Sequence, residues 1–254
     1  MKKYVNLFVF VFMIGACLSQ GRAQTKSAVS YKNPVVDIAM PDPTVIKAAD
    51  GYFYVYATES TRNVPIMKSK DLVEWTYCNT AFTNKTRPRF EPKAGIWAPD
   101  INYINGKYVL YYAMSVWGGE QTCGIGVATA NSPQGPFTDH SKMFRSNEIG
   151  VQNSIDPSLL QYEGRNYLVW GSFRGIYVIE LTADGLSIMS GAKKKRIAGT
   201  AFEAVYIHKH GDYYYMFASI GSCCQGVKST YKVVVGRSKK VWGPYKDKTG
   251  KPML

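Results

Sequence analysis

The segment Gly51-Tyr-Phe-Tyr-Val-Tyr-Ala57 decides the fold of this 254-residue chain, because the same pattern occurs four times. A glycine followed by an aromatic-rich stretch recurs as Gly106-Lys-Tyr-Val-Leu-Tyr-Tyr, Gly164-Arg-Asn-Tyr-Leu-Val-Trp and Gly211-Asp-Tyr-Tyr-Tyr-Met-Phe. The intervals between the glycines are 55, 58 and 47 residues. A repeat of this length corresponds to one supersecondary unit of several strands.

Each repeat has the same order of motifs around its glycine. A short apolar strand is predicted before each glycine, at 43–47, 100–104, 157–162 and 204–208. A third strand is predicted after each aromatic stretch, at 65–68, 124–128, 175–179 and 233–236. A turn with an aromatic residue closes the unit at 71–75, 135–137 and 243–245. Asp50-Gly51 and Asn105-Gly106 are typical hairpin dipeptides.

These repeats predict an all-β fold, a β-propeller with about four blades in this chain. Each small antiparallel sheet can bury its faces only against its neighbours. A β-sandwich would also contain many short strands, but it would not repeat one order of motifs. The composition agrees, since 46% hydrophobic and 14% aromatic residues exclude a disordered chain.

The first residues are predicted to be an export signal over residues 1–23. Lys2 and Lys3 precede an apolar run that is too short to span a membrane. Two processing sites compete: cleavage before Gln24, or a bacterial lipobox that would leave Cys17 as a lipid-bearing N-terminus. The propeller domain is expected over residues 30–254. Its location is predicted to be periplasmic, secreted or anchored to the outer membrane of a bacterium.

The chain is basic even without its leader. Removing Lys2, Lys3 and Arg22 leaves 28 basic and 18 acidic residues. The sharpest basic run, residues 193–196, is interpreted as a solvated loop beside a strand. Nucleic-acid binding is not expected, because no known module interleaves basic residues with stacking aromatics. A positive surface could steer the protein to an acidic polysaccharide such as pectin.

The five cysteines show no zinc-binding spacing. Cys78, Cys123, Cys223 and Cys224 follow the leader, and their pairing cannot be read from the sequence. The adjacent Cys223 and Cys224 could form a vicinal disulfide or pack as small hydrophobic side chains in a turn. The second interpretation is favoured.

Aligning the repeats on their glycines predicts a site. The residue eight positions upstream is Ala98 in the second repeat, Asp156 in the third and Glu203 in the fourth. Asp42 corresponds to them in the first repeat, whose turn is one residue longer. Because inner strands of a propeller begin around one axis, these three carboxylates are predicted to converge. The competing interpretation of Asp42 and Asp156 is that each opens an Asp-Pro turn.

Converging carboxylates favour acid/base chemistry over metal binding. Mutual repulsion separates their pKa values, and glycoside hydrolysis requires one protonated and one ionised carboxyl. A hard cation usually takes clustered oxygen ligands, and no Asp-x-Asp-x-Asp loop occurs. Nearby Tyr and Trp side chains would stack on sugar rings.

Four blade-opening segments resemble those of glycoside hydrolase family 43. They are Pro41-Asp42-Pro43-Thr44-Val45-Ile46, Gly95-Ile96-Trp97-Ala98-Pro99-Asp100-Ile101, Ser154-Ile155-Asp156-Pro157-Ser158-Leu159 and Phe202-Glu203-Ala204-Val205-Tyr206-Ile207. The segments 171–173, 221–224, 229–231 and 235–238 are most similar to the arabinan-cleaving branch. The resemblance covers residues 34–254 and implies a five-bladed propeller of an inverting glycosidase.

The resemblance also implies roles for individual residues. Asp42 matches the general base that activates water, Glu203 the general acid, and Asp156 a third carboxylate that tunes and orients the acid. Three further residues match positions that commonly face the substrate: Trp97, Asn153 and Ser172.

Two departures from the family pattern concern its fifth blade and its calcium ion. Only four repeats are present, so the sequence is expected to be a fragment or a short variant that closes differently. Arabinan-cleaving members often hold calcium near the axis through a histidine, and His140, His208 and His210 do not match that position. No cofactor is expected to be required, and no metal ligand can be assigned.

The expected function is exported hydrolysis of α-L-arabinofuranosyl linkages, with internal cleavage of 1,5-linked arabinan by an inverting mechanism. The expected partner is plant cell-wall arabinan or another pectic side chain. The alternatives are an α-L-arabinofuranosidase or β-xylosidase of the same family, and a non-catalytic glycan-binding propeller.

Overall fold

The computed structural model describes residues 30–254, and the fold concerns the compact unit from Asn33 to Leu254. The predicted signal peptide and Cys17 lie outside the described residues. None of the helices in residues 30–254 is long and apolar enough to cross a membrane.

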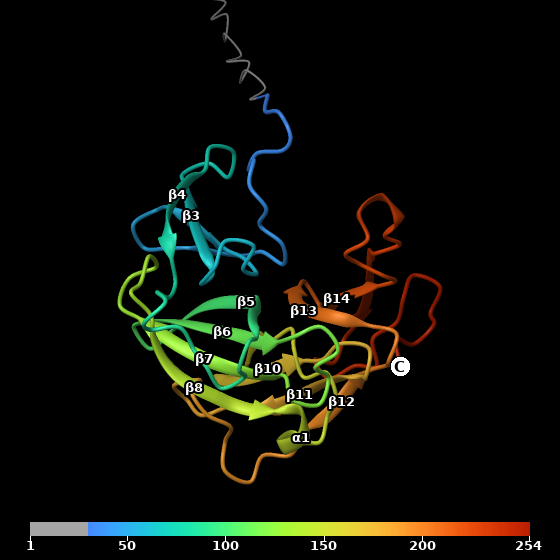
Figure 1. Ribbon diagram of the computed structural model, residues 1–254. Coiled ribbons are helices and arrows are strands. Elements are labelled where there is room, and N and C mark those ends of the chain that lie inside the picture. The colour runs from blue at the N-terminus through green and yellow to red at the C-terminus, as the bar shows by residue number, and fades with distance from the viewer. Residues whose placement is uncertain (1–29) are drawn as a thin grey trace, which may run out of the picture. The chain divides into compact units, whose positions relative to one another are not determined.

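Four antiparallel sheets follow one another along the chain (Figure 1). The first contains β1 (Thr44–Lys47), β2 (Phe53–Tyr56), β3 (Pro65–Ser69) and β4 (Thr76–Thr80). The second contains β5 (Gly95–Ile104), β6 (Lys107–Ser115), β7 (Gly124–Ala130) and β8 (Thr138–Arg145). The third contains β9 (Ser158–Tyr162), β10 (Arg165–Trp170), β11 (Ile176–Glu180) and β12 (Lys195–Ala198). The fourth contains β13 (Glu203–His210), β14 (Tyr213–Ile220) and β15 (Lys232–Ser238).

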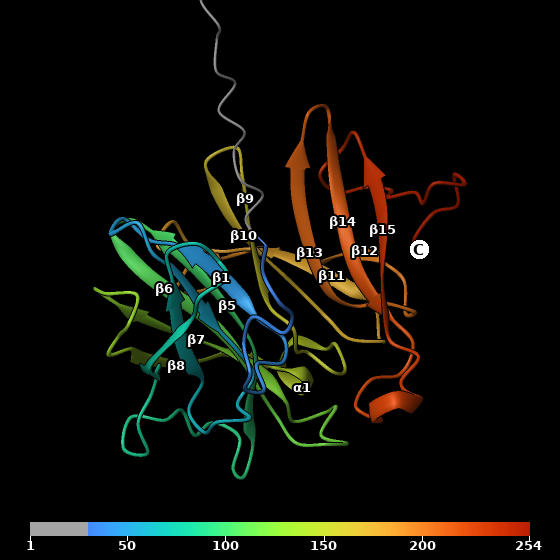
Figure 2. The same ribbon diagram turned by 90° about the horizontal axis from the view of Figure 1, so that it is seen from above.

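The first strands of consecutive sheets contact one another, so the sheets are arranged as blades. β1 contacts β5, β5 contacts β9, and β9 contacts β13. In Figure 2 the strands of the fourth blade, β13 to β15, lie side by side. The all-β propeller with about four blades is therefore confirmed. Two short helices, α1 (Ser146–Ile149) and η1 (Gly226–Lys228), lie in connections.

The aromatic second strands lie in the middle of their blades and are covered on both faces. Side chains on such a strand alternate between the two faces. Tyr112 packs in the cluster between the first and second blades, whereas Tyr111 packs in the cluster between the second and third. Met216 packs between the third and fourth. This two-sided burial explains why these strands are apolar throughout instead of alternating with polar residues.

Side chains at one repeated position of the inner strands join neighbouring blades. Thr44 Oγ1 accepts a hydrogen bond from the backbone N–H of Ile101, at 3.3 Å. Asp100 Oδ2 accepts one from the N–H of Leu159, at 2.7 Å. The third link runs from Ser158 Oγ to the carbonyl of Val205, at 2.7 Å. These bonds hold the starts of the inner strands together around the axis.

The adjacent cysteines correct one expectation. Cys223 and Cys224 are joined by a disulfide in the connection between β14 and β15, and they are not packed as small hydrophobic side chains. The connection is largely exposed, so it offers no core for two thiols to fill. Cys78 and Cys123 are free.

The basic run behaves as expected. All four residues are exposed; Lys193 and Lys194 lie in the loop before β12, and Lys195 and Arg196 are the first two residues of that strand.

Candidate active site

A cavity of about 620 Å³ lies where the four inner strands begin. One residue from each blade opens this cavity, and all four have left-handed backbone: Asp42, Ala98, Asp156 and Ala204, with φ of 48°, 41°, 58° and 52°. Left-handed backbone is uncommon for residues other than glycine, and its recurrence here marks one structural position in four blades. The blade-opening positions predicted from the repeats therefore do converge.

The structure corrects the position of Glu203 within its repeat. The left-handed residue of the fourth blade is Ala204, so Glu203 stands one residue before the position of Asp42 and Asp156. The reason is the hairpin: His210 pairs with Tyr213, which makes Gly211 the first residue of its turn, whereas Gly106 and Gly164 are the second. Alignment on the glycines therefore shifted the fourth repeat by one residue. Of the four structurally equivalent positions, two are acidic, Asp42 and Asp156, and the other two are alanines.

Glu203 is nevertheless brought to the site, at the edge of the cavity beside lining residues Ala204 and Tyr231. Its side chain is buried, and Ser172 Oγ donates a hydrogen bond to Oε2 at 2.6 Å. Asn153 Nδ2 donates to Ser172 Oγ at 2.9 Å. A chain of hydrogen bonds thus fixes the carboxyl.

Ser172 and Asn153 lie beside Glu203, and neither of them lines the carboxyl cavity. Ser172 is 1% exposed and lies behind Glu203, so its observed partner is the carboxyl and not the open cavity. Asn153 is half-buried and donates to both the hydroxyl and the carbonyl of Ser172. Both residues position Glu203.

Tyr231 lines the carboxyl cavity from the fourth blade, and the repeat pattern did not predict it. Burial first, and then the nearby carboxyls of Glu203 and Asp156, raise the pKa of the Tyr231 hydroxyl, while Ser219 opposes the shift. Tyr231 belongs to the segment 229–231, which is similar to the arabinan-cleaving branch of the family, and this similarity could have marked it as a site residue.

Asp42 is oriented by Thr58, which follows β2. Thr58 Oγ1 donates to Asp42 Oδ2 at 2.6 Å and accepts from the N–H of Ala98 at 2.7 Å. The carboxylate is exposed to solvent and lines the cavity. An exposed, oriented carboxylate can accept a proton from a water molecule.

The charges of both other carboxyls, Glu203 and Asp42, influence the protonation of Asp156. Burial first, and then the negative charges of Glu203 and Asp42, raise its pKa well above the usual value. Asp42 and Asp156 line the same cavity, and Glu203 directly precedes the lining residue Ala204, so the three predicted carboxyls gather at one end of the propeller.

Asp100 also lines the cavity, and its role is mainly structural. Burial raises its pKa to about 6, while hydrogen bonds from Leu159 N–H and Asn102 oppose the shift. It forms the link between the second and third blades described above.

Trp97 forms an aromatic pair with Trp117, a residue that the family resemblance did not indicate. Its ring centroid lies 5.6 Å from that of Trp117, which is 78% exposed. Trp97 is half-buried against Ala113, Cys123 and Ile155. The buried ring supports the exposed one, and the pair offers a face on which a sugar ring could stack.

Within residues 30–254, no group of three His, Cys, Asp or Glu side chains could hold a metal ion. His140 hydrogen bonds with Thr129, and His208 and His210 are exposed on β13.

A propeller with a carboxyl cluster at the mouth of its inner strands is the architecture of a glycosidase. The family model "Glycosyl hydrolases family 43" matches residues 31–254. The chain belongs to glycoside hydrolase family 43.

Two curated relatives carry names that specify an activity. An extracellular endo-α-(1→5)-L-arabinanase 1 of Bacillus subtilis is 38% identical over 226 residues, covering 84% of this chain and 69% of that protein. An extracellular exo-α-(1→5)-L-arabinofuranosidase of Cellvibrio japonicus is 36% identical over 240 residues, covering 84% and 67%.

Solved structures agree with these relatives. The α-L-arabinanase of Cellvibrio cellulosa superposes with a TM-score of 0.77 at 33% identity, covering 85% of this chain and 76% of that one. The same enzyme in complex with arabinohexaose gives a TM-score of 0.76.

Proposed function

We propose that this protein hydrolyses α-1,5-linked L-arabinan with inversion at the anomeric carbon. The observation that carries the proposal is the carboxyl cluster, in which the charges of Glu203 and Asp42 both act on Asp156. The arabinan substrate is proposed from the two named relatives and from the arabinohexaose complex.

Glu203 is proposed as the general acid. Ser172 holds one carboxyl oxygen, and the Tyr231 hydroxyl lies near the same group, so the carboxyl has a fixed direction. In the reaction its proton passes to the glycosidic oxygen as the bond to the anomeric carbon breaks. Proton transfer then avoids an alkoxide leaving group, which would otherwise limit the rate.

Asp42 is proposed as the general base. It accepts a proton from water while the water oxygen attacks the anomeric carbon from the opposite face. Thr58 leaves one oxygen of Asp42 free for this contact. For inversion, the two carboxyl groups should be roughly 6.5–9.5 Å apart in the substrate complex, with room for the water.

Asp156 is proposed to hold the third position of the cluster. Its raised pKa keeps a proton within the carboxyl cluster. This proton can be shared with the neighbouring Glu203, which transfers it as the general acid. The Trp97–Trp117 pair is proposed as a stacking platform for an arabinose ring.

The test is product analysis with debranched linear arabinan. Release of arabino-oligosaccharides of several lengths, with initial products of inverted anomeric configuration by NMR, supports the proposal. Hydrolysis of xylan and not of arabinan would move the protein to a β-xylosidase function. Glycan binding without any hydrolysis would make it a binding propeller.

Cleavage from the chain end is the second candidate, because one named relative is exo-acting. A single oligosaccharide size from the first minutes of reaction would support exo action, whereas a mixture of sizes supports internal cleavage. Viscosity falls early only for internal cleavage, so viscometry provides an independent readout.

The proposed location is outside the cytoplasm, as in the two relatives that are named extracellular. Lipid attachment at Cys17 is proposed as the finer alternative to free secretion. Incorporation of labelled palmitate into the wild-type protein, and its loss in Cys17→Ser, would support the anchor. Release of unlabelled protein that begins at Gln24 would support secretion.

A further inference from the structure

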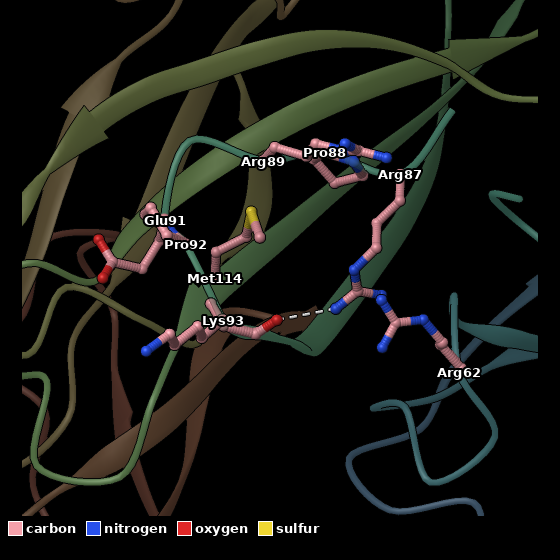
Figure 3. Close-up of a pocket in the computed structure, with 9 residues that line it drawn as sticks. Arg62, Arg87, Pro88, Arg89, Glu91, Pro92, Lys93 and Met114 are labelled. Carbon is pink, nitrogen blue, oxygen red and sulfur yellow. Dashed lines mark hydrogen bonds between the residues drawn. The ribbon is translucent and has the colours of Figure 1, made fainter. Parts of the chain in front are cut away.

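A second cavity, of about 530 Å³, lies between the connection from β4 to β5 and the loop from β2 to β3. Nine residues line it (Figure 3): Arg62, Arg87, Pro88, Arg89, Glu91, Pro92, Lys93, Ala94 and Met114. None of its lining residues lines the carboxyl cavity described above. Its walls carry three arginines and one lysine, so its chemistry differs from that of the carboxyl cluster.

Arg87 forms the fixed wall of this cavity. It is buried and paired with Glu59, and it also donates to the carbonyl of Ala94 at 2.8 Å and to Asn63 Oδ1 at 3.2 Å. Four of its five N–H donors are therefore used within the protein. Arg87 provides the framework of the site, and its charge is already balanced.

Arg62 and Arg89 are exposed, and each donates a hydrogen bond from one guanidinium nitrogen to Asn84. Arg62 Nε donates to Asn84 Oδ1 at 3.1 Å, and one terminal nitrogen of Arg89 donates to the carbonyl of Asn84 at 3.0 Å. One residue thus anchors both exposed guanidinium groups. In Figure 3 the guanidinium group of Arg62 points toward that of Arg87. Because Glu59 already neutralises Arg87, the guanidinium group of Arg62 is the unbalanced positive charge at this end of the cavity.

The carboxylates at this cavity already have cationic partners. Glu59 pairs with Arg87, and Glu91 pairs with Arg145 at 3.1 Å. Within residues 30–254, no ion pair is formed by Arg62, Arg89 or Lys93. The cavity therefore carries an excess of three positive charges, which attracts anions.

We infer that this cavity is a binding site for a carboxylated sugar, such as one uronic-acid unit of an acidic polysaccharide. The planar fork of a guanidinium matches a carboxylate better than a spherical ion. The rings of Pro88 and Pro92 line the cavity beside these charges and offer apolar contact to a sugar ring. The choice of a glycan rests on the proposed function. If the substrate is an arabinan side chain of an acidic polysaccharide such as pectin, the enzyme meets uronic-acid units next to its substrate.

The probe is trigalacturonate, and its methyl ester is the matched neutral ligand. Titration calorimetry with the full chain at about 50 mM salt should detect trigalacturonate binding and no binding of the ester. Raising the salt concentration to about 200 mM should weaken binding severalfold, because the charges are exposed to screening. Equal binding of the ester would overturn the inference.

The matched variants are Arg62→Ala/Arg89→Ala and Lys193→Ala/Lys194→Ala. Both remove two exposed positive charges, but only the first removes them from the cavity. The first should weaken trigalacturonate binding by about tenfold or more, as expected for lost charge-assisted hydrogen bonds. The second should bind like the wild type. Equal affinities of the cavity variant and the wild type would overturn the inference.

Two outcomes separate this site from the proposed activity. Hydrolysis of neutral arabinan without trigalacturonate binding would refute the uronate site and leave the proposed function intact. Trigalacturonate binding without hydrolysis of arabinan would refute the proposed function, and the cavity would remain an anion site. If inorganic phosphate bound as tightly as trigalacturonate at the same concentration, specificity for a carboxylated sugar would be refuted.

Discussion

Ser172 Oγ donates a 2.6 Å hydrogen bond to Glu203 Oε2, although the two residues are 31 positions apart in the chain. The same two residues form an isolated β-bridge, so their backbones are adjacent as well. The direction of the proposed acid is therefore set by the third blade, while the acid itself belongs to the fourth. A substitution at Ser172 should therefore change the orientation of the Glu203 carboxyl while leaving Glu203 itself unchanged.

Ser172→Ala should lower kcat on linear arabinan by about tenfold, the effect of losing one hydrogen bond to a carboxyl. KM should change little, because Ser172 is buried away from the cavity. An aryl arabinoside whose leaving group needs little protonation should be affected less. Ser69→Ala is the control, since it removes another buried hydroxyl that bonds to a carboxylate, outside the carboxyl cavity, and should not distinguish the two substrates.

Glu203→Gln keeps the size of the side chain and removes the transferable proton. Hydrolysis of arabinan should fall by roughly 10²–10⁴-fold, the usual contribution of a general acid. Hydrolysis of the activated aryl arabinoside should fall much less. Equal losses on both substrates, measured as kcat/KM, would show that Glu203 is not the acid.

Thr58→Val removes the hydroxyl that orients Asp42 and preserves the shape of the side chain. Since water activation is needed whatever the leaving group, kcat should fall by about tenfold on both substrates. Asp42→Asn should affect both substrates in the same way and more strongly. Thr80→Val serves as the control, because the Thr80 hydroxyl bonds to the carbonyl of Phe82 and lies outside the carboxyl cavity. A leaving-group-dependent effect of Thr58→Val would contradict the assignment of Asp42 as base.

Asp100 should make the folded state less stable as the pH rises. Burial raises its pKa to about 6, so the folded protein holds this proton more tightly than the unfolded chain does. The resulting stabilisation is complete below about pH 4 and is lost as the pH rises through about 6.

Asp100→Asn should therefore remove part of this pH dependence and raise the free energy of unfolding above pH 6 by about 3 kcal/mol. Both hydrogen bonds to Asp100 go to Oδ2, so an asparagine carbonyl can keep them. Urea unfolding at pH 4, 6 and 8 measures the effect. The exposed Asp212→Asn is the control, and an identical pH profile for both variants would contradict the prediction.

Glu59→Gln should destabilise the fold by about 3–5 kcal/mol, because it leaves the buried charge of Arg87 without a partner. Burial alone would raise the pKa of Glu59, but hydrogen bonds from Arg87 and from two backbone N–H groups outweigh it and lower the pKa. This stabilisation is present above about pH 4 and is lost as the pH falls through the lowered pKa.

Thermal unfolding of Glu59→Gln at neutral pH tests the pair. Glu74→Gln is the matched control, since Glu74 is exposed and forms no ion pair within residues 30–254. Equal melting temperatures of the two variants would indicate that the Arg87 charge is not buried as described.

The blades could be read from the sequence because their signals are local. The strand from Arg165 to Trp170 follows its turn glycine directly, and the structure places it at the predicted residues. A glycine turn followed by residues of high β-propensity defines a strand from its own neighbours. The closing turns at Phe137 and Tyr245 were found in the same way, and both aromatic side chains are buried.

The sequence by itself determined that Asp42 and Asp156 occupy equivalent blade-opening positions, because spacing along each strand is local. Only the tertiary structure decided that Glu203 stands one residue before that position, since a hairpin register depends on which residues pair across the turn. The contacts of Thr58 with Asp42 and of Ser172 with Glu203 were likewise beyond the sequence. They join residues from different repeats or different strands, and only packing around a common axis brings such residues together.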